Sequence, residues 1–252
     1  MRLNPVSAAA GAVVDGTLAA VAAVRRGKAV HPHGAVHRAT LHVPGAPAAP
    51  EAARLFSEPG EHEALVRFSR SVGLPRPLPD LLGMAIRVLD AYGPDRHQDL
   101  LMVTSVDLPV AHHMFVPAGD VQQRVYSSSL PFRAGDERFL VGALPRPDSP
   151  RPDGDDELDR LRRAAATGRL RFDVAVARLG GRFRPVAELH VGEPLGPELD
   201  ALRFNPFNAG GGMEPTGTLN RWRAAAYPWS QAAWRRTGHD AARRQDAADA
   251  AA

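Results

Sequence analysis

The sequence predicts an α+β protein built on an antiparallel sheet or barrel. Several runs alternate between apolar and polar side chains, as strands do, and loops rich in Pro and Gly separate them. A helical pattern follows the last of these strands. The chain has 252 residues and is 44% hydrophobic, which is sufficient for the core of one large domain.

The N-terminal part contains a predicted helix followed by a strand. Residues 8–26 carry apolar side chains at helical spacing, and Gly27 would end this helix. Residues 36–43 alternate between apolar and polar side chains, which is typical of a half-buried strand. A Pro/Ala loop at residues 44–50 and a short helix at residues 51–56 follow.

Three further strands are predicted before the middle of the chain. They comprise residues 65–69, 83–89 and 99–103, and the Pro-rich residues 74–79 join the first two. The Ser-rich residues 126–132 are interpreted as a loop over a site.

A second group of elements follows this loop. Residues 145–156 are dense in Pro, Asp and Gly and are expected to be exposed, and residues 159–167 are expected to be helical. Residues 170–179 and 186–191 alternate well, and Gly180-Gly181 lies between them, so they are predicted to pair as two strands.

The last predicted element is a helix over residues 218–236. The Ala/Arg/Asp-rich residues 241–252 are expected to be a frayed tail. The organisation expected is therefore a single domain over residues 1–240 followed by that tail.

Composition excludes several functional classes. The formal charge is only +3, Lys28 is the sole lysine and the arginines are scattered, so no nucleic-acid partner is expected. The absence of cysteine excludes disulfides and thiol catalysis. No apolar run is long enough for a membrane span, and Arg25-Arg26 follows the apolar segment instead of preceding it as in a signal peptide. A cytoplasmic protein is expected.

A group of histidines lies near the N-terminus. His31, His33 and His37 would face the same side of a strand, and His42 lies close behind them. Histidine is the most common metal ligand, but no carboxylate or thiolate is nearby in the sequence. The alternatives are a metal site and a loop followed by a half-exposed strand.

Arg223 and Tyr227 lie four residues apart on the predicted C-terminal helix. Residues at this spacing share a face, and a guanidinium beside a phenol favours the phenolate, an oxygen ligand for ferric haem. The alternative is a packed tyrosine with a solvated arginine nearby.

Two further segments have alternative readings. Arg67 and Ser69 point to the same side of their strand, where they line a cavity or face water. The run Gly210-Gly211-Gly212 lacks the residues of a phosphate-binding loop, and we interpret it as a flexible loop with a close backbone approach.

Six motifs in the same chain order resemble those of catalases. They span roughly residues 28–236, with an unmatched middle at about 115–200. The matching segments are Val30-His31-Pro32-His33-Gly34-Ala35, Val66-Arg67-Phe68-Ser69-Arg70-Ser71-Val72-Gly73, Asp80-Leu81-Leu82-Gly83-Met84-Ala85, Asp99-Leu100, Phe204-Asn205-Pro206-Phe207-Asn208 with Gly212-Met213-Glu214-Pro215, and Arg223-Ala-Ala-Ala-Tyr227-Pro228.

The resemblance implies an antiparallel β-barrel of catalase type with surrounding helices, without the catalase C-terminal domains. It also implies a haem b cofactor. By analogy, His31 would be the distal acid–base group, Ser69 would orient it, and Tyr227 would ligate the iron as a phenolate held ionised by Arg223. The further haem-contacting residues implied are Lys28, Val30, Arg67, Gly83, Val103, Phe115 and Arg235.

The sequence departs from the family at one distal position. Val103 stands where catalases have an asparagine, and the neighbouring Thr104 is the polar candidate for that role. The resemblance therefore predicts a haem-dependent oxidoreductase acting on hydrogen peroxide or organic hydroperoxides in a peroxidase-like way. The alternatives are a haem-binding or sensing module without turnover, and a haem-free protein that binds a metal through His31, His33 and His37. A monomer or small homo-oligomer is expected.

Overall fold

The computed structural model describes residues 34–71, 74, 78–196, 199 and 202–217. The chain divides into two units, Met1–Pro215 and Thr216–Ala252. Of the second unit, only Thr216 and Gly217 are described. The helices predicted over residues 8–26 and 218–236 lie outside the described residues.

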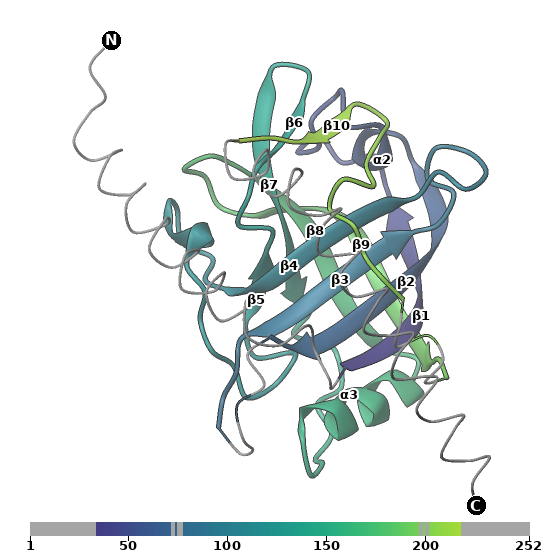
Figure 1. Cartoon of the computed structure of the whole chain (residues 1–252), viewed down its shortest axis with the longest axis vertical. Coiled ribbons are helices and arrows are strands. Elements are labelled where there is room, and N and C mark those ends of the chain that lie inside the picture. Colours follow the sequence, from purple (N-terminus) through teal and green to yellow (C-terminus); the bar gives the residue numbers. More distant parts are fainter. Residues whose placement is uncertain (1–33, 72–73, 75–77, 197–198, 200–201, 218–252) are drawn as a thin grey trace, which may run out of the picture. The chain divides into compact units, whose positions relative to one another are not determined.

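The first unit is a closed antiparallel β-barrel, shown in Figure 1. Eight strands form the ring in the order β7-β5-β4-β3-β2-β1-β9-β8, and pairing of β7 with β8 closes it. Strands β6 and β10 extend the sheet beyond β7. The strands are β1 (Gly34–Val43), β2 (Gly60–Arg70), β3 (Leu82–Val88), β4 (Gln98–Ser105), β5 (Val125–Ser127), β6 (Phe132–Ala134), β7 (Glu137–Pro145), β8 (Leu170–Arg178), β9 (Arg184–Pro194) and β10 (Met213–Pro215).

Alternation along the strands separates a barrel interior from an outer face. Phe68, Met84 and Met102 are neighbours on β2, β3 and β4, and all are almost completely buried in the core. Because successive side chains point to opposite faces, the residues between them lie on the outer face. The apolar pattern of the sequence therefore determines which side of each strand is inside.

The three helical elements of the described chain are short. They are α2 (Arg54–Ser57), the 3-10 turn η1 (Ala111–His113) and α3 (Glu157–Ala166), which lies across the lower end of the barrel in Figure 1. Helix α3 is capped at its N-terminus by Asp156, whose carboxylate accepts hydrogen bonds from the backbone N–H groups of Leu158 and Asp159, both at 2.9 Å. Its apolar face buries Leu161, Ala164 and Ala165.

A buried ion cluster attaches α3 to the barrel. The guanidinium of Arg70, at the end of β2, lies 3.3 Å from the Asp80 carboxylate and 3.1 Å from the Glu157 carboxylate. It also donates to the carbonyls of Leu74 and Leu78. All three charged side chains are at most 6% exposed, so the two carboxylates depend on the guanidinium that they share.

The predicted strands near residues 36–43, 65–69, 83–89 and 99–103 are confirmed, as is the pair joined at Gly180-Gly181. The short helix expected at residues 51–56 is α2, which begins later, at Arg54. The prediction that residues 126–132 form a loop was wrong at both ends. Tyr126 is a buried residue of β5, and Phe132 begins β6.

The Gly210–Gly212 segment makes the close backbone approach that the sequence predicted. Gly212 has a φ of +84°, and a Cβ there would overlap the carbonyl oxygen of Ala52. Gly211 also accepts a hydrogen bond from the Arg54 N–H at 2.9 Å. The glycines therefore pack this loop against the segment that leads into α2.

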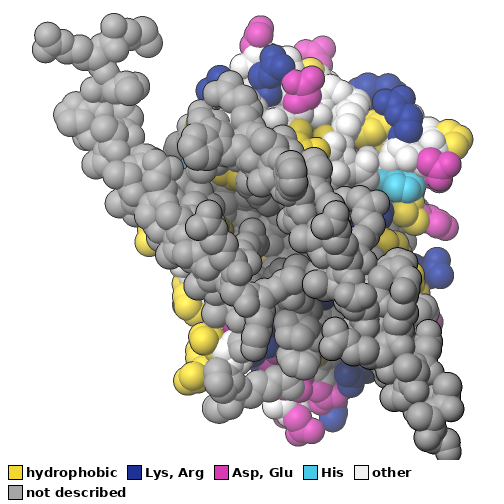
Figure 2. All heavy atoms as spheres, in the orientation of Figure 1, with side chains coloured by type: hydrophobic (Ala, Val, Ile, Leu, Met, Phe, Trp, Pro, Cys, Tyr) yellow, Lys and Arg dark blue, Asp and Glu magenta, His cyan; other side chains and the backbone are white. Residues whose placement is uncertain are grey.

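The described surface carries both signs of charge. Figure 2 shows Lys/Arg and Asp/Glu side chains interspersed on the visible described atoms, without a broad patch of one sign there. None of the described helices is long and apolar enough to cross a membrane.

Candidate functional site

Three of the predicted site residues come together on the outer face of β2, β3 and β4. Ser69 pairs with Gly83, and Gly83 pairs with Val103, so the three form one row across adjacent strands. The row is continued by Gly34 on β1, which pairs with Ser69. The pairing register therefore gathers residues from three distant motifs onto one surface.

Gly83 has no side chain, so nothing projects outward from the centre of this row. A Cβ on Gly83 would lie 3.0 Å from the Ser69 hydroxyl oxygen and 3.4 Å from the Ser71 hydroxyl oxygen. The next row on the same face contains Ala85 and Leu101. These residues are half-buried and small or apolar, so the surface beside Ser69 is flat and mostly apolar.

Arg67 lies on the same outer face, one row from Ser69. It pairs with Val36 on one side and Ala85 on the other, and it is 9% exposed. Its guanidinium lies over β1, since a Cβ on Gly34 would be 2.7 Å from one terminal nitrogen of Arg67. A positive group is thus held at the margin of the apolar surface.

Thr104 is not part of this surface. It pairs with the core residue Tyr126 and lies on the interior face of β4, opposite to Val103. Its hydroxyl accepts a hydrogen bond from the backbone N–H of Leu82 at 3.1 Å. The expectation that Thr104 substitutes for a distal asparagine is therefore corrected, because its side chain points to the wrong side of the strand.

Phe115 is half-buried in the loop that follows η1. The N–H of the next residue, Val116, donates to the Thr104 carbonyl at 3.0 Å, so this loop runs beside the end of β4. The structure thus places Phe115 near the strand that carries Val103.

The remaining predicted site residues lie outside the described part of the chain. They are Lys28, Val30, His31, Arg223, Tyr227 and Arg235.

His37 lies inside the barrel. It shares the inward face of β1 with Ala39 and Leu41, is completely buried, and places Nδ1 3.0 Å from the Gly192 carbonyl oxygen. Burial lowers the pKa of His37, and the nearby charge of Arg162 lowers it further, while the Gly192 hydrogen bond opposes the shift. The prediction of a half-exposed strand is confirmed, and His37 lies on the buried face of that strand. The metal alternative that includes His37 therefore lacks an accessible ligand there.

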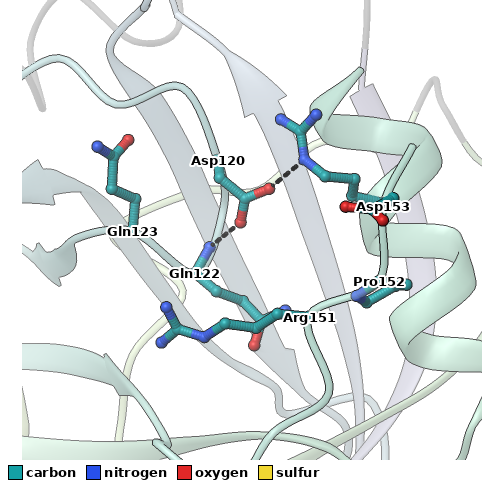
Figure 3. A pocket seen from close by; sticks show the side chains of 7 residues that line it. Asp120, Gln122, Gln123, Arg151, Pro152 and Asp153 are labelled. Atoms are coloured by element: carbon teal, nitrogen blue, oxygen red, sulfur yellow. Dashed lines mark hydrogen bonds and ion pairs between the residues drawn. The ribbon is translucent and has the colours of Figure 1, made fainter. Parts of the chain in front are cut away.

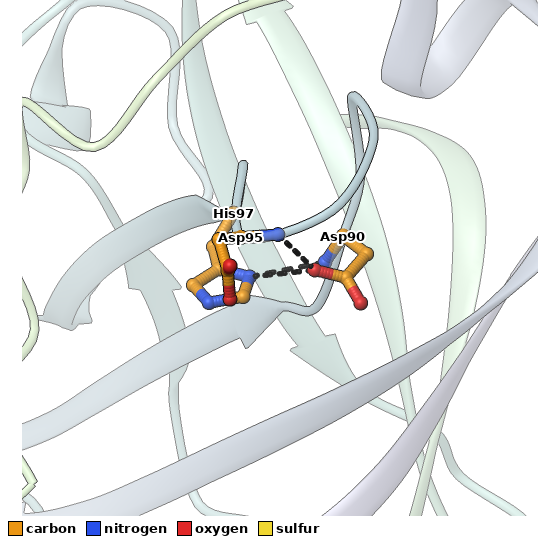
Figure 4. A group of neighbouring side chains, drawn as sticks. All are labelled: Asp90, Asp95 and His97. Carbon is orange, nitrogen blue, oxygen red and sulfur yellow. Dashed lines mark hydrogen bonds and ion pairs between the residues drawn. The ribbon is translucent and has the colours of Figure 1, made fainter.

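A different group of metal-ligand side chains lies at the β3–β4 turn. Asp90, Asp95 and His97 each bring one ligand atom within 4.8 Å of the others. Figure 4 shows the three side chains gathered at this turn. The His97 Nδ1 accepts the N–H of Asp90 at 3.0 Å, and the Asp90 carboxylate accepts the N–H of Asp95 at 2.8 Å. These hydrogen bonds stabilise the turn, and they explain why the three side chains lie close together.

A polar pocket of about 310 Å³ lies beside the N-terminal end of α3 (Figure 3). Asp120 lies at its centre and accepts from Arg160 Nε at 2.6 Å and from the Gln122 N–H at 2.8 Å. These contacts connect the loop after η1 to α3.

The motif that contains Asp99 connects β4 to the segment around Asn205. This carboxylate accepts two hydrogen bonds from Arg87, at 2.7 and 2.6 Å, and one from the Asn205 N–H at 2.7 Å. Asp99 is completely buried, and its contact with Asn205 attaches the Phe204–Asn208 motif to the barrel.

No protein-family model and no curated protein match the sequence. Solved structures resemble the chain, among them two that are each 12% identical to it. A bacterial catalase has a TM-score of 0.51 and a fungal catalase one of 0.55, and each alignment covers 80% of this chain. The chain spans less than two thirds of these catalases, because the alignments cover 56% and 58% of their lengths. The likeness confirms the predicted catalase-like antiparallel barrel.

Proposed function

We propose that this protein is a haem-dependent oxidoreductase that acts on hydrogen peroxide or organic hydroperoxides. The observation that carries the proposal is the row Ser69–Gly83–Val103 on the outer face of a catalase-like barrel. Three residues that the motif resemblance assigned to a haem site are neighbours in that row, although their motifs are far apart in the sequence.

The described surface fits a planar, largely apolar cofactor with anionic groups at its margin. Gly83 and Ala85 leave the face low, Leu101 and Val103 make it apolar, and Arg67 supplies a positive charge at one side. A buried guanidinium favours carboxylates, which it can bind through two hydrogen bonds.

The position of His31 in the sequence supports a role for this residue beside the surface. Gly34 pairs with Ser69, and His31 precedes Gly34 by three residues. Three residues span at most about 11 Å when fully extended, so this separation in the sequence would permit the His31 imidazole to reach the Ser69 row. This supports the proposal that Ser69 orients the His31 ring.

The residues of the chain would divide the chemistry between them. Haem would supply the redox-active iron, with Tyr227 as its phenolate ligand and Arg223 favouring the ionised phenol. His31 would accept a proton from the bound peroxide and return it to the leaving oxygen. Ser69 would hold the imidazole ring in one orientation by a hydrogen bond.

A second candidate function is favoured by Val103. Its side chain donates no hydrogen bond to a peroxide, and Thr104 points into the barrel, so neither residue replaces the distal asparagine of catalases. A haem-binding or sensing module without rapid turnover is consistent with this surface.

Two variants of the purified protein, reconstituted with haem, test the proposal. Tyr227→Phe should weaken haem retention or shift the Soret band, and an unchanged spectrum would exclude Tyr227 as the ligand. His31→Ala should keep haem but lose peroxide turnover. Steady oxygen release or donor oxidation by the wild-type holoprotein would exclude the sensing module.

A further inference from the structure

The rings of His42 and His190 lie against one another in a tilted arrangement on the outer face of the barrel, away from the Ser69 row. Their ring centroids are 4.3 Å apart with an interplanar angle of 52°. Leu41 and Leu189, the paired neighbours of these residues on β1 and β9, are completely buried, so the two imidazoles project outward. The side chains are 38% and 35% exposed, which leaves them accessible to a dissolved ion.

Each imidazole is held by a carboxylate at one of its two ring nitrogens. The His42 Nδ1 lies 2.9 Å from the Glu61 carboxylate, and the His190 Nε2 lies 2.6 Å from the Glu188 carboxylate. A carboxylate at one ring nitrogen places the hydrogen there and leaves the lone pair on the other nitrogen. The free lone pairs are therefore on Nε2 of His42 and Nδ1 of His190, and neither atom has a hydrogen-bond partner among the described residues.

The carboxylate that holds His190 is itself fixed. Glu188 lies 2.8 Å from an Arg146 terminal nitrogen and 3.4 Å from one of Arg171. Arg146 also contacts Asp148 and Asp173, so its charge is shared with other carboxylates. These contacts orient the Glu188 oxygen toward the imidazole without placing an unbalanced positive charge beside it.

We propose that His42 and His190 bind a divalent transition-metal ion, with Glu61 and Glu188 as the carboxylates that orient them. Metal-ligating histidines commonly use one ring nitrogen for the metal and the other for a carboxylate, and both imidazoles here are prepared in this way. Neutral imidazole suits Zn²⁺, Cu²⁺ and Ni²⁺, and water completes the coordination of a site with few protein ligands. The site is separate from the proposed haem surface.

Calorimetric titration of the purified chain with Zn²⁺, after removal of bound metal by a chelator, tests the proposal. The wild type should bind one ion at this site, and His42→Ala and His190→Ala should each weaken that binding by roughly tenfold or more. Glu61→Gln should weaken it by roughly tenfold, because loss of an orienting carboxylate typically lowers metal affinity by that amount.

Two control variants localise the binding. His97→Ala removes the histidine of the Asp90–Asp95–His97 turn, and the double variant His31→Ala/His33→Ala removes the N-terminal pair. Neither control should change the affinity by more than about twofold. Binding that is lost in a control but kept in His42→Ala and His190→Ala would overturn the proposal, as would absence of Zn²⁺ binding to the wild type.

NMR provides a readout that does not depend on whether the variants fold. In wild-type protein, Zn²⁺ should shift the ring signals of His42 and His190 together and saturate at one equivalent. Unshifted ring signals for both residues at saturating Zn²⁺ would overturn the assignment.

Discussion

Ser69 and Gly83 face one another across β2 and β3, and a Cβ on Gly83 would lie 3.0 Å from the Ser69 hydroxyl oxygen. The proposed haem surface depends on this clearance. Gly83→Leu should project a side chain from the outer face and obstruct a planar cofactor. Overpacking of this kind costs about 1–3 kcal/mol, and about 1.4 kcal/mol corresponds to a tenfold change in affinity. Haem titration should therefore show roughly tenfold weaker uptake.

The matched control is Glu63→Leu, which places the same side chain on an exposed outer position of β2. It should leave haem uptake unchanged. Equal uptake by Gly83→Leu and wild type would show that haem does not lie over this row.

Val103→Asn should raise peroxide turnover without changing haem content, if the proposed function is right. An amide at this outer position could donate a hydrogen bond to the peroxide, and one well-placed donor is worth about a hundredfold or more in rate in other enzymes. Steady-state oxygen release by the holoprotein measures the effect. No gain in turnover, with haem content maintained, would count against the placement of Val103 on the reacting side.

Thr104→Val, on the same strand, should change stability and leave turnover unchanged. The Thr104 hydroxyl is buried and accepts from the Leu82 N–H, so its loss should destabilise the fold by about 1–3 kcal/mol. Turnover per haem should not change. A selective loss of turnover in Thr104→Val would contradict its position inside the barrel.

The Arg70 cluster predicts a large stability effect far from the haem surface. Arg70→Met leaves the buried carboxylates of Asp80 and Glu157 without their shared cation, which typically costs about 3–5 kcal/mol. Denaturant unfolding measures this loss. Arg54→Met breaks the exposed pair with Glu58 and should change stability by less than about 1 kcal/mol. Similar losses of unfolding free energy in Arg70→Met and Arg54→Met would contradict the claim that burial makes the Arg70 ion pairs more important than the exposed pair.

His37 predicts part of the acid sensitivity of the fold. Burial lowers its pKa below 6.5, so between the folded pKa and 6.5 the unfolded chain binds a proton that the folded chain does not. Stability therefore falls as the pH falls through this window, by at most about 1.4 kcal/mol per pH unit for one proton. Unfolding free energies from neutral pH to about pH 5 should depend less on pH in His37→Gln than in wild type. The pH dependence that remains in His37→Gln includes a contribution from His62, because burial also lowers the pKa of His62. Identical slopes would exclude His37 as a contributor.

Much of the barrel could be predicted because several strands have one apolar face. In β2 and β3 the alternation of Val66 and Phe68, and of Met84 and Ile86, distinguishes the interior from the outer face. The same alternation predicted that Arg67 and Ser69 share a side. Strand β5 was missed because it has only three residues, Val125, Tyr126 and Ser127, and leads into a Ser-rich segment.

The error at Thr104 has a physical reason. Strand β4 is apolar on both faces, with Leu100 and Met102 inside and Leu101 and Val103 outside. The sequence of β4 therefore does not indicate whether Thr104 points into the barrel or outward. Only the pairing of Val103 with Gly83 resolves the question. The contact between the His42 and His190 rings could not be predicted from the sequence either, because it depends on pairing between β1 and β9.

The absorbance spectrum of the purified protein tests the central claim most directly. After reconstitution with one equivalent of haem and removal of the excess, we expect a stable Soret band of the ferric tyrosinate type that changes in Tyr227→Phe. A protein that retains no haem after this treatment, or that gives the same spectrum with and without the Tyr227 hydroxyl, would contradict the assignment of this barrel to haem chemistry through Tyr227.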